Sequence, residues 1–221
     1  MILQSGEVEY VGGGKGTQNT IINGNIDMKA GDDTLTLAKG TIINGNIAMG
    51  ADNDTLTAEA ESIINGSFDG GEGIDKLSLK SGAMVNGNIA MGAGNDTLTA
   101  EAESIINGSF DGGAGDDKLS LKSGAMVNGN ITMGNANDTL TIEAGSIING
   151  TLDGGMESDT LSFNSPATRT SNSNGINIHH NISGFENMNI NTNVTLFEKI
   201  VKDDGTLEDL AITGAENITI G

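Results

Sequence analysis

Apolar and polar residues alternate along this chain in short runs that recur at a fixed interval. In the segment 33–37, which reads Asp-Thr-Leu-Thr-Leu, the apolar positions fall on every second residue, as in a strand with one buried face. Thr and branched residues favour strands, and the Gly and Asn clusters that interrupt the runs are typical of turns. Between Gly24 and Phe163 no helical periodicity is found. The pattern predicts many short strands.

The recurring interval is 21 residues. Seven asparagines, each followed by a glycine, keep this spacing, and so do seven aspartates. The asparagines are Asn23, Asn44, Asn65, Asn86, Asn107, Asn128 and Asn149; the aspartates are Asp33, Asp54, Asp75, Asp96, Asp117, Asp138 and Asp159. Residues 44–71 and 86–113 differ only where Asp52 stands against Gly94, so a 42-residue double unit overlies the 21-residue unit.

A unit of this length fits one turn of a solenoid with two or three short strands, whereas helical repeats need about 33 residues or more. Coils stacked about 4.8 Å apart place equivalent residues in columns. One column is all leucine and is expected to point inward: Leu35, Leu56, Leu77, Leu98, Leu119, Leu140 and Leu161. In the next column small residues are compensated, since Phe68 and Phe110 belong to the same repeats as Ala58 and Ala100. The sequence predicts an all-β parallel β-helix (solenoid) with 21 residues per coil and one continuous core.

A second apolar pair is harder to place, because the neighbours Ile42 and Ile43 would point to opposite faces of a regular strand. Either the chain bends at this pair, or the first member of each pair belongs to an apolar stripe that would mark a contact surface. The residues of that column are Ile42, Ile63, Met84, Ile105, Met126 and Ile147. We favour the bend.

The composition changes after Phe163. Pro166, the only proline, lies in a Ser/Asn/Thr-rich stretch from Ser165 to Asn174, and irregular strand-like pieces follow. Terminal coils of a solenoid must differ from internal ones, because an open end exposes the core and a strand edge. We divide the chain into an N-terminal coil or cap (1–22), a β-helix region of seven coils (23–164) and irregular C-terminal coils or a cap (165–221).

The net charge of the chain limits the classes of molecule that it is expected to bind. The chain has 30 acidic and ten basic residues and a formal net charge of −20, which argues against nucleic acid, since phosphate binding needs positive charge. No apolar run approaches the length of about 18 residues that spans a membrane, so we expect no membrane insertion by this segment. The first ten residues lack the pattern of a secretion signal.

The segment 71–79, Gly-Glu-Gly-Ile-Asp-Lys-Leu-Ser-Leu, followed by 82–89, Gly-Ala-Met-Val-Asn-Gly-Asn-Ile, resembles the passenger domains of Gram-negative type V autotransporters. The segment 182–190, Ile-Ser-Gly-Phe-Glu-Asn-Met-Asn-Ile, is similar to the coils that close such passengers before their translocator. The resemblance implies a right-handed parallel β-helix, exported through an outer-membrane barrel and acting in virulence as an adhesin, aggregation factor or toxin. Because the chain shows neither a signal peptide nor a barrel, we expect an excised passenger segment.

Calcium is an alternative chemistry for the turns. The segments 70–75 and 112–117 match the G-G-x-G-x-D loop of RTX-type β-rolls, which hold Ca²⁺ between stacked turns, and 92–96 keeps all but the first glycine. The candidate metal residues are Gly73, Asp75, Gly94, Asp96, Gly115 and Asp117. A β-roll repeats this loop every nine residues on both edges, whereas here the second edge carries Asn-Gly. We therefore favour a structural role, in which Gly supplies turn geometry and Asp caps the turn, and we expect no cofactor.

The sequence contains few residues or motifs that are typical of an active site. The chain has no cysteine, one arginine (Arg169) and two histidines (His179 and His180), which we interpret as surface residues. A carboxylate that recurs in seven coils is typical of a structural role, whereas an active site needs one unique set of catalytic groups. We therefore expect that this chain is not an enzyme. T-x-T pairs such as Thr34/Thr36 would form hydroxyl ladders like those of ice-binding solenoids, but Lys76 and Lys118 interrupt them, and we interpret the pairs as ordinary outward strand residues.

The sequence thus favours an extracellular segment at the bacterial cell surface that works by binding, with a host-cell receptor, a glycan or another copy of itself as partner. Its acidic surface would keep such rods soluble. Two alternatives are an RTX-like calcium-binding β-roll module of a secreted protein and a carbohydrate-active β-helix enzyme.

Overall fold

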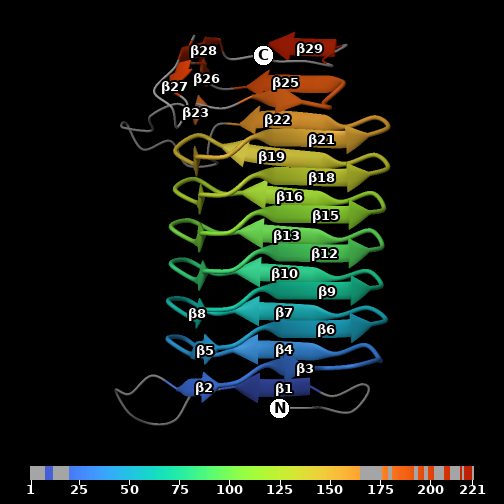
Figure 1. Cartoon of the computed structure of the whole chain (residues 1–221), viewed down its shortest axis with the longest axis vertical. Helices are drawn as coiled ribbons and strands as arrows, with labels where there is room; N and C mark the ends of the chain where they lie inside the picture. The colour runs from blue at the N-terminus through green and yellow to red at the C-terminus, as the bar shows by residue number, and fades with distance from the viewer. Residues whose placement is uncertain are drawn as a thin grey trace.

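The computed structural model describes residues 8–11, 20–164, 176–178, 181–191, 194–196, 199–201, 207–209, 215 and 217–220. Within these ranges every regular element is a strand, and the chain winds into a parallel β-helix of about seven regular turns (Figure 1). The predicted all-β fold and the 21-residue coil are confirmed. The described residues include no helix long and apolar enough to cross a bilayer.

Three parallel sheets form the walls of the solenoid, and each coil contributes one strand to each of them. The Thr sheet contains, in axial order, β1 (Val8–Val11), β4 (Thr34–Leu37), β7 (Thr55–Ala58), β10 (Lys76–Leu79), β13 (Thr97–Ala100), β16 (Lys118–Leu121), β19 (Thr139–Glu143), β22 (Thr160–Asn164), β25 (Asn187–Asn191) and β29 (Asn217–Ile220). The Ile sheet contains β2 (Ile21–Asn23), β5 (Ile42–Asn44), β8 (Ile63–Ile64), β11 (Met84–Val85), β14 (Ile105–Ile106), β17 (Met126–Val127), β20 (Ile147–Ile148), β23 (Ile176–Ile178) and β26 (Val194–Leu196).

The third wall, which we call the Gly sheet, contains β3 (Ile26–Asp27), β6 (Ile47–Ala51), β9 (Phe68–Glu72), β12 (Ile89–Ala93), β15 (Phe110–Ala114), β18 (Ile131–Asn135), β21 (Leu152–Met156) and β24 (Ile182–Ser183). A separate antiparallel pair joins β27 (Lys199–Val201) and β28 (Leu207–Asp209). In Figure 1 the strands of the Thr and Gly sheets overlap and run in opposite directions, while the short strands of the Ile sheet lie at the left side. The Thr and Gly sheets are therefore the two broad faces, and the Ile sheet is a narrow side.

The register follows the repeat. Leu77 pairs with Leu98, Met84 with Ile105 and Gly92 with Gly113, each 21 residues further on. In the C-terminal region the sequence predicts strands at 176–178, 188–190 and 217–220, and strands are found there on the same sheets. The stretch from Ser165 to Asn174, with Pro166, lies outside the described residues.

The core is one continuous cluster that runs along the axis. The predicted leucine column is fully buried from Leu35 to Leu161. Volume is balanced within the Gly sheet, because coils with Ile47 or Ile89 place a buried Met two residues later, whereas coils with Phe68 or Phe110 place a Gly there. A narrow interior of constant volume requires such pairing.

The preferred interpretation of the Ile42–Ile43 pair is wrong. Thr41 and Ile43 are buried, whereas Ile42 between them points outward, so the strand alternates normally and does not bend. The outward column is half-buried in most coils and reaches 44% exposure at Ile147. The first members of the pairs therefore form an apolar stripe along the Ile sheet.

Candidate functional site

The aspartate column lies at the turn from the Gly sheet to the Thr sheet, immediately before each Thr strand. All seven side chains are buried, with no more than 1% of the residue exposed. Asp75 Oδ1 accepts a hydrogen bond from the backbone N–H of Asp54 at 2.8 Å, and Asp96 Oδ1 accepts one from Asp75 N–H at 2.7 Å. The same contact continues through Asp117, Asp138 and Asp159. Each carboxyl therefore caps the preceding coil, whereas the sequence predicted bonds within its own turn.

The second carboxyl oxygen has a different environment. From Asp54 to Asp159 the Oδ2 atoms are buried and accept no hydrogen bond. A Cβ placed on Gly70 would lie 2.7 Å from Asp75 Oδ2, so this oxygen packs against the backbone on the inner side of the turn. A buried carboxylate oxygen without a donor is costly when it carries charge.

Protonation relieves that cost. Burial, partly offset by the hydrogen bond from the neighbouring coil, raises the pKa of Asp54, Asp75, Asp138 and Asp159 to about 6 and that of Asp117 to about 7. Neighbouring carboxylates add to the effect, since Asp69 raises the pKa of Asp75 and Asp111 that of Asp117. The self-repulsion expected of a stacked aspartate column is thus reduced by bound protons.

The predicted calcium residues lie together on this edge. Gly73, Gly94 and Gly115 have left-handed φ values of 134°, 137° and 121°, so they supply turn geometry. The carboxyls of Asp75, Asp96 and Asp117 each use one oxygen on the neighbouring coil. Among the described residues no group of three or more Asp, Glu or His side chains is arranged to hold a metal ion. Calcium at this edge stays the alternative to the structural role that the sequence favours.

The repeated asparagines form a hydrogen-bonded ladder along the axis. Each Nδ2 donates to the Oδ1 of the asparagine in the preceding coil, at 2.6 to 2.7 Å from Asn44 to Asn149. From Gly45 to Gly150 the glycine after the asparagine is needed for close approach: a Cβ on Gly66, for example, would lie 2.3 Å from the Gly45 carbonyl oxygen. This ladder is exposed on the outer edge of the Ile sheet.

The same turn as the buried aspartates carries a second ladder on its outside, which the sequence did not reveal. Asp32 Oδ1 accepts from Asn53 N–H at 2.9 Å, and Asn53 Oδ1 accepts from Ile74 N–H at 2.8 Å. Ile74, which is 52% exposed, has no acceptor and interrupts the series before it resumes at Asn95 and Asp116. The polar residue before every buried aspartate except Asp75 was the available signal.

The outer face of the Thr sheet carries two columns of short polar side chains. One is made of hydroxyls throughout: Thr36, Thr57, Ser78, Thr99, Ser120, Thr141 and Ser162. The other contains Thr34, Thr55, Thr97, Thr139 and Thr160, with Lys76 and Lys118 in alternate coils. Neither column contains a carboxylate, and both lysines are exposed.

The outer face of the Gly sheet is acidic. Asp69 and Asp111 are exposed there and alternate along one column with Ala48, Ala90 and Thr132. Beside this column runs a track of glycines without side chains. A hollow of about 350 Å³ over Ala48 is bounded by Asp27, Asn46, Ser67 and Asp69.

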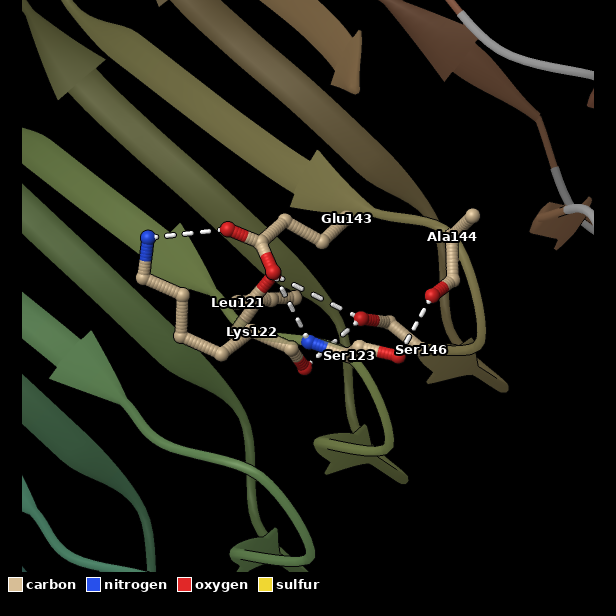
Figure 2. A network of polar contacts seen from close by, with 6 residues as sticks. All are labelled: Leu121, Lys122, Ser123, Glu143, Ala144 and Ser146. Atoms are coloured by element: carbon tan, nitrogen blue, oxygen red, sulfur yellow. Dashed lines mark hydrogen bonds and ion pairs between the residues drawn. The ribbon is translucent and has the colours of Figure 1, made fainter. Parts of the chain in front are cut away.

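The corner between the Thr and Ile sheets is held by a polar network (Figure 2). Lys122 Nζ pairs with Glu143 Oε1 at 2.9 Å, and Ser123 Oγ donates to the Ala144 carbonyl at 2.7 Å. Ser146 Oγ donates to the Lys122 carbonyl at 3.0 Å. These contacts tie successive coils together, so this corner is structural. Arg169, His179 and His180 lie outside the described residues.

No family model and no curated protein matches the chain. Among solved structures, it is similar to a hyperactive, Ca²⁺-dependent, β-helical antifreeze protein from an Antarctic bacterium, with a TM-score of 0.47 and 20% sequence identity. The match covers 85% of this chain and 60% of the other, so this chain spans less than two thirds of that protein's length. The chain itself is a β-helical repeat protein by its own strand pairing.

Proposed function

We propose that this chain is a segment of an extracellular protein at the bacterial cell surface that acts by binding, as an adhesin or aggregation module. The observation that carries the proposal is the unbroken hydroxyl column from Thr36 to Ser162 on one broad face. Such a face offers the same donors and acceptors at every coil, about 4.8 Å apart, to a partner that also repeats. A glycan, a host-cell receptor or another copy of the chain are the partners we expect.

The placement of the acids supports binding over catalysis. The most regular carboxyls, those of the aspartate column, are buried and hydrogen-bonded to the neighbouring coil, so they are not presented to a substrate. Many outward-facing residues of the described coils recur along the axis, such as the asparagines of the ladder and the hydroxyls of the Thr sheet. A repeated surface acts through many weak contacts, whereas an active site needs one set of groups held around one substrate.

Attachment of protein-coated beads tests the proposal. Beads carrying the purified chain are expected to bind epithelial-cell monolayers or immobilised polysaccharide, or to clump with one another, more than beads coated with albumin. Replacing the hydroxyls in T57V/T99V is expected to weaken that attachment several-fold, because valine keeps the shape and removes the hydrogen bonds. The matched control T20V/T151V removes two threonines that lie outside the strands of the Thr and Gly sheets.

Wild-type beads that neither attach nor clump would overturn the proposal. The remaining alternatives have separate readouts. A calcium-binding module would unfold on addition of a chelator, and a carbohydrate-active enzyme would release reducing ends from the polysaccharides used in the same assay.

A further inference from the structure

The two broad faces of the solenoid carry opposite charges at the same interval. On the Thr sheet, Lys76 and Lys118 are 42 residues apart, which is two coils or about 9.6 Å along the axis. On the Gly sheet, Asp69 and Asp111 are also 42 residues apart in one column. The interval is the same because both pairs belong to the 42-residue double unit.

All four charges are free to meet a partner. Lys76, Lys118, Asp69 and Asp111 are exposed, and the ion pairs found in the described coils involve other residues, namely Lys29, Lys39 and Lys122 with their carboxylates. The hydroxyl and lysine columns of the Thr sheet contain no carboxylate. Thus Lys76 and Lys118 lie on one broad face and Asp69 and Asp111 on the other, while Glu143, at the end of β19, is paired with Lys122.

The neighbouring side chains leave room for contact. Beside Asp69 and Asp111 lies the glycine track, where a Cβ on Gly71 would fall within 1.9 Å of the Gly50 carbonyl oxygen. This strip of the Gly sheet is therefore bare backbone. Along the axis, the two outward columns of the Thr sheet would present Thr and Ser hydroxyls on either side of each lysine. Ile74 and Asp116, two residues before Lys76 and Lys118, lie at the adjoining turn. Sheets pack face to face about 10 Å apart, a gap that a lysine paired with an aspartate can bridge.

We propose that the Thr sheet of one copy docks on the Gly sheet of a second copy, with Lys76 facing Asp69 and Lys118 facing Asp111 of the neighbour. Within a coil, Asp69 and Lys76 are seven residues apart, a third of a turn, so their heights differ by about 1.6 Å. Two parallel copies at the same height therefore bring both pairs together without sliding. This inference rests on the proposed function, of which it specifies the aggregation partner.

The contact is heterologous, because different faces meet. Each docked pair leaves one Thr sheet and one Gly sheet free, so copies add side by side without closing. Exposed ion pairs are individually weak, which makes the contact weak between two copies and strong only where many copies are displayed together.

Charge reversal tests this arrangement. At physiological ionic strength, where the screening length is about 8 Å, distant repulsion between the acidic rods is damped and contact pairs remain. Sedimentation equilibrium of the wild type should show reversible self-association. K76E/K118E and D69K/D111K should each weaken it about tenfold or more, because like charges then face each other. An equimolar mixture of the two variants should associate again.

The D69K/D111K variant distinguishes the effect of the proposed contact on self-association from the effect of the net charge. It makes the protein less acidic, so a general charge effect would strengthen association, whereas the proposed contact weakens it. E61K/E103K is the matched control: it changes the net charge equally, at the same 42-residue interval, on the corner beside the Ile sheet. This control should associate at least as well as the wild type. Association of D69K/D111K equal to that of the control would overturn the proposal.

The absence of cysteine allows a second test by cross-linking. Thr97 and Ala90 occupy the lysine and aspartate columns one coil above Lys76 and Asp69. With a short bismaleimide, a mixture of T97C and A90C should give more mixed dimer than either variant gives with itself. Equal yields would contradict the heterologous contact. If these tests fail while coated beads still attach to cells, the binding function stands and this mode of self-association does not.

Discussion

Asp117 Oδ1 accepts a hydrogen bond from the backbone N–H of Asp96, 21 residues earlier, at 2.8 Å. The same link joins successive coils along the edge between the two broad sheets, and its cost is a buried second oxygen without a donor. The aspartate column therefore stabilises stacking through one oxygen and opposes ionisation through the other.

This arrangement predicts that the protein is more stable in mild acid than at neutral pH. The folded-state pKa of these carboxyls is about 6 to 7, above the ordinary value of 3.8. Between these values the folded chain holds protons that the unfolded chain has lost, so the free energy of unfolding falls as pH rises from about 4 to 7 and is level above that. A rise from 3.8 to about 6 corresponds to about 3 kcal/mol for one carboxyl. Urea unfolding at several pH values measures it.

A single substitution separates the column from the general acidity of the surface. Asp117→Asn keeps an acceptor for Asp96 N–H and cannot ionise, so its unfolding free energy should depend less on pH than that of the wild type. Glu103→Gln, which removes an exposed carboxylate, should leave the slope unchanged. A wild-type protein whose stability rises towards neutral pH would contradict the assignment.

The hydrogen bond itself is tested by removing the acceptor. Asp117→Ala leaves the Asp96 N–H without its partner in a buried turn, and we expect it to be about 1–3 kcal/mol less stable than Asp117→Asn. Asp117→Asn should be at least as stable as the wild type at about pH 7.5, because it also removes the buried charge. Thermal and urea melts of both variants measure this difference, and an alanine variant as stable as the asparagine variant would count against the link.

Glycines of the two turn types should respond differently to alanine. At Gly66 an added Cβ would meet the Gly45 carbonyl oxygen at 2.3 Å, which forces two coils apart, and we expect a loss of more than about 3 kcal/mol. At Gly82 the nearest atom is 3.7 Å away, so only the φ of 74° opposes alanine and the loss should be about 1 kcal/mol. Melting curves of Gly66→Ala and Gly82→Ala measure the contrast; equal losses would mean that the coils can separate locally.

Much of this architecture follows from the sequence because the repeat places equivalent residues in columns. The leucine column and the asparagine ladder need only the 21-residue spacing. The Ile42–Ile43 pair was misjudged because both residues are apolar, and only the burial of Thr41 reveals which of them points inward. The bond from Asp54 to Asp75 was also missed, because spacing does not say whether an aspartate caps its own turn or the next coil.

The positions of the charged residues on the two broad sheets were likewise not predictable from spacing alone. Lys76, Lys118, Asp69 and Asp111 are visible in the double unit, yet the spacing of seven positions from Asp69 to Lys76 does not reveal that a turn separates them. Only the fold places the aspartates on one broad face and the lysines on the other.

Calcium provides the last prediction. Ca²⁺ prefers six to eight oxygen ligands, whereas Asp75, Asp96 and Asp117 are buried and each carboxyl already accepts a backbone N–H. We expect the melting temperature to be the same in EDTA and in millimolar CaCl₂, apart from a general salt effect that MgCl₂ reproduces. A metal bound only by the folded chain must raise that temperature by mass action. A rise specific to Ca²⁺ that D96N abolishes would place the ion at this column, and the buried oxygens would then be ligands whose protons the metal displaces.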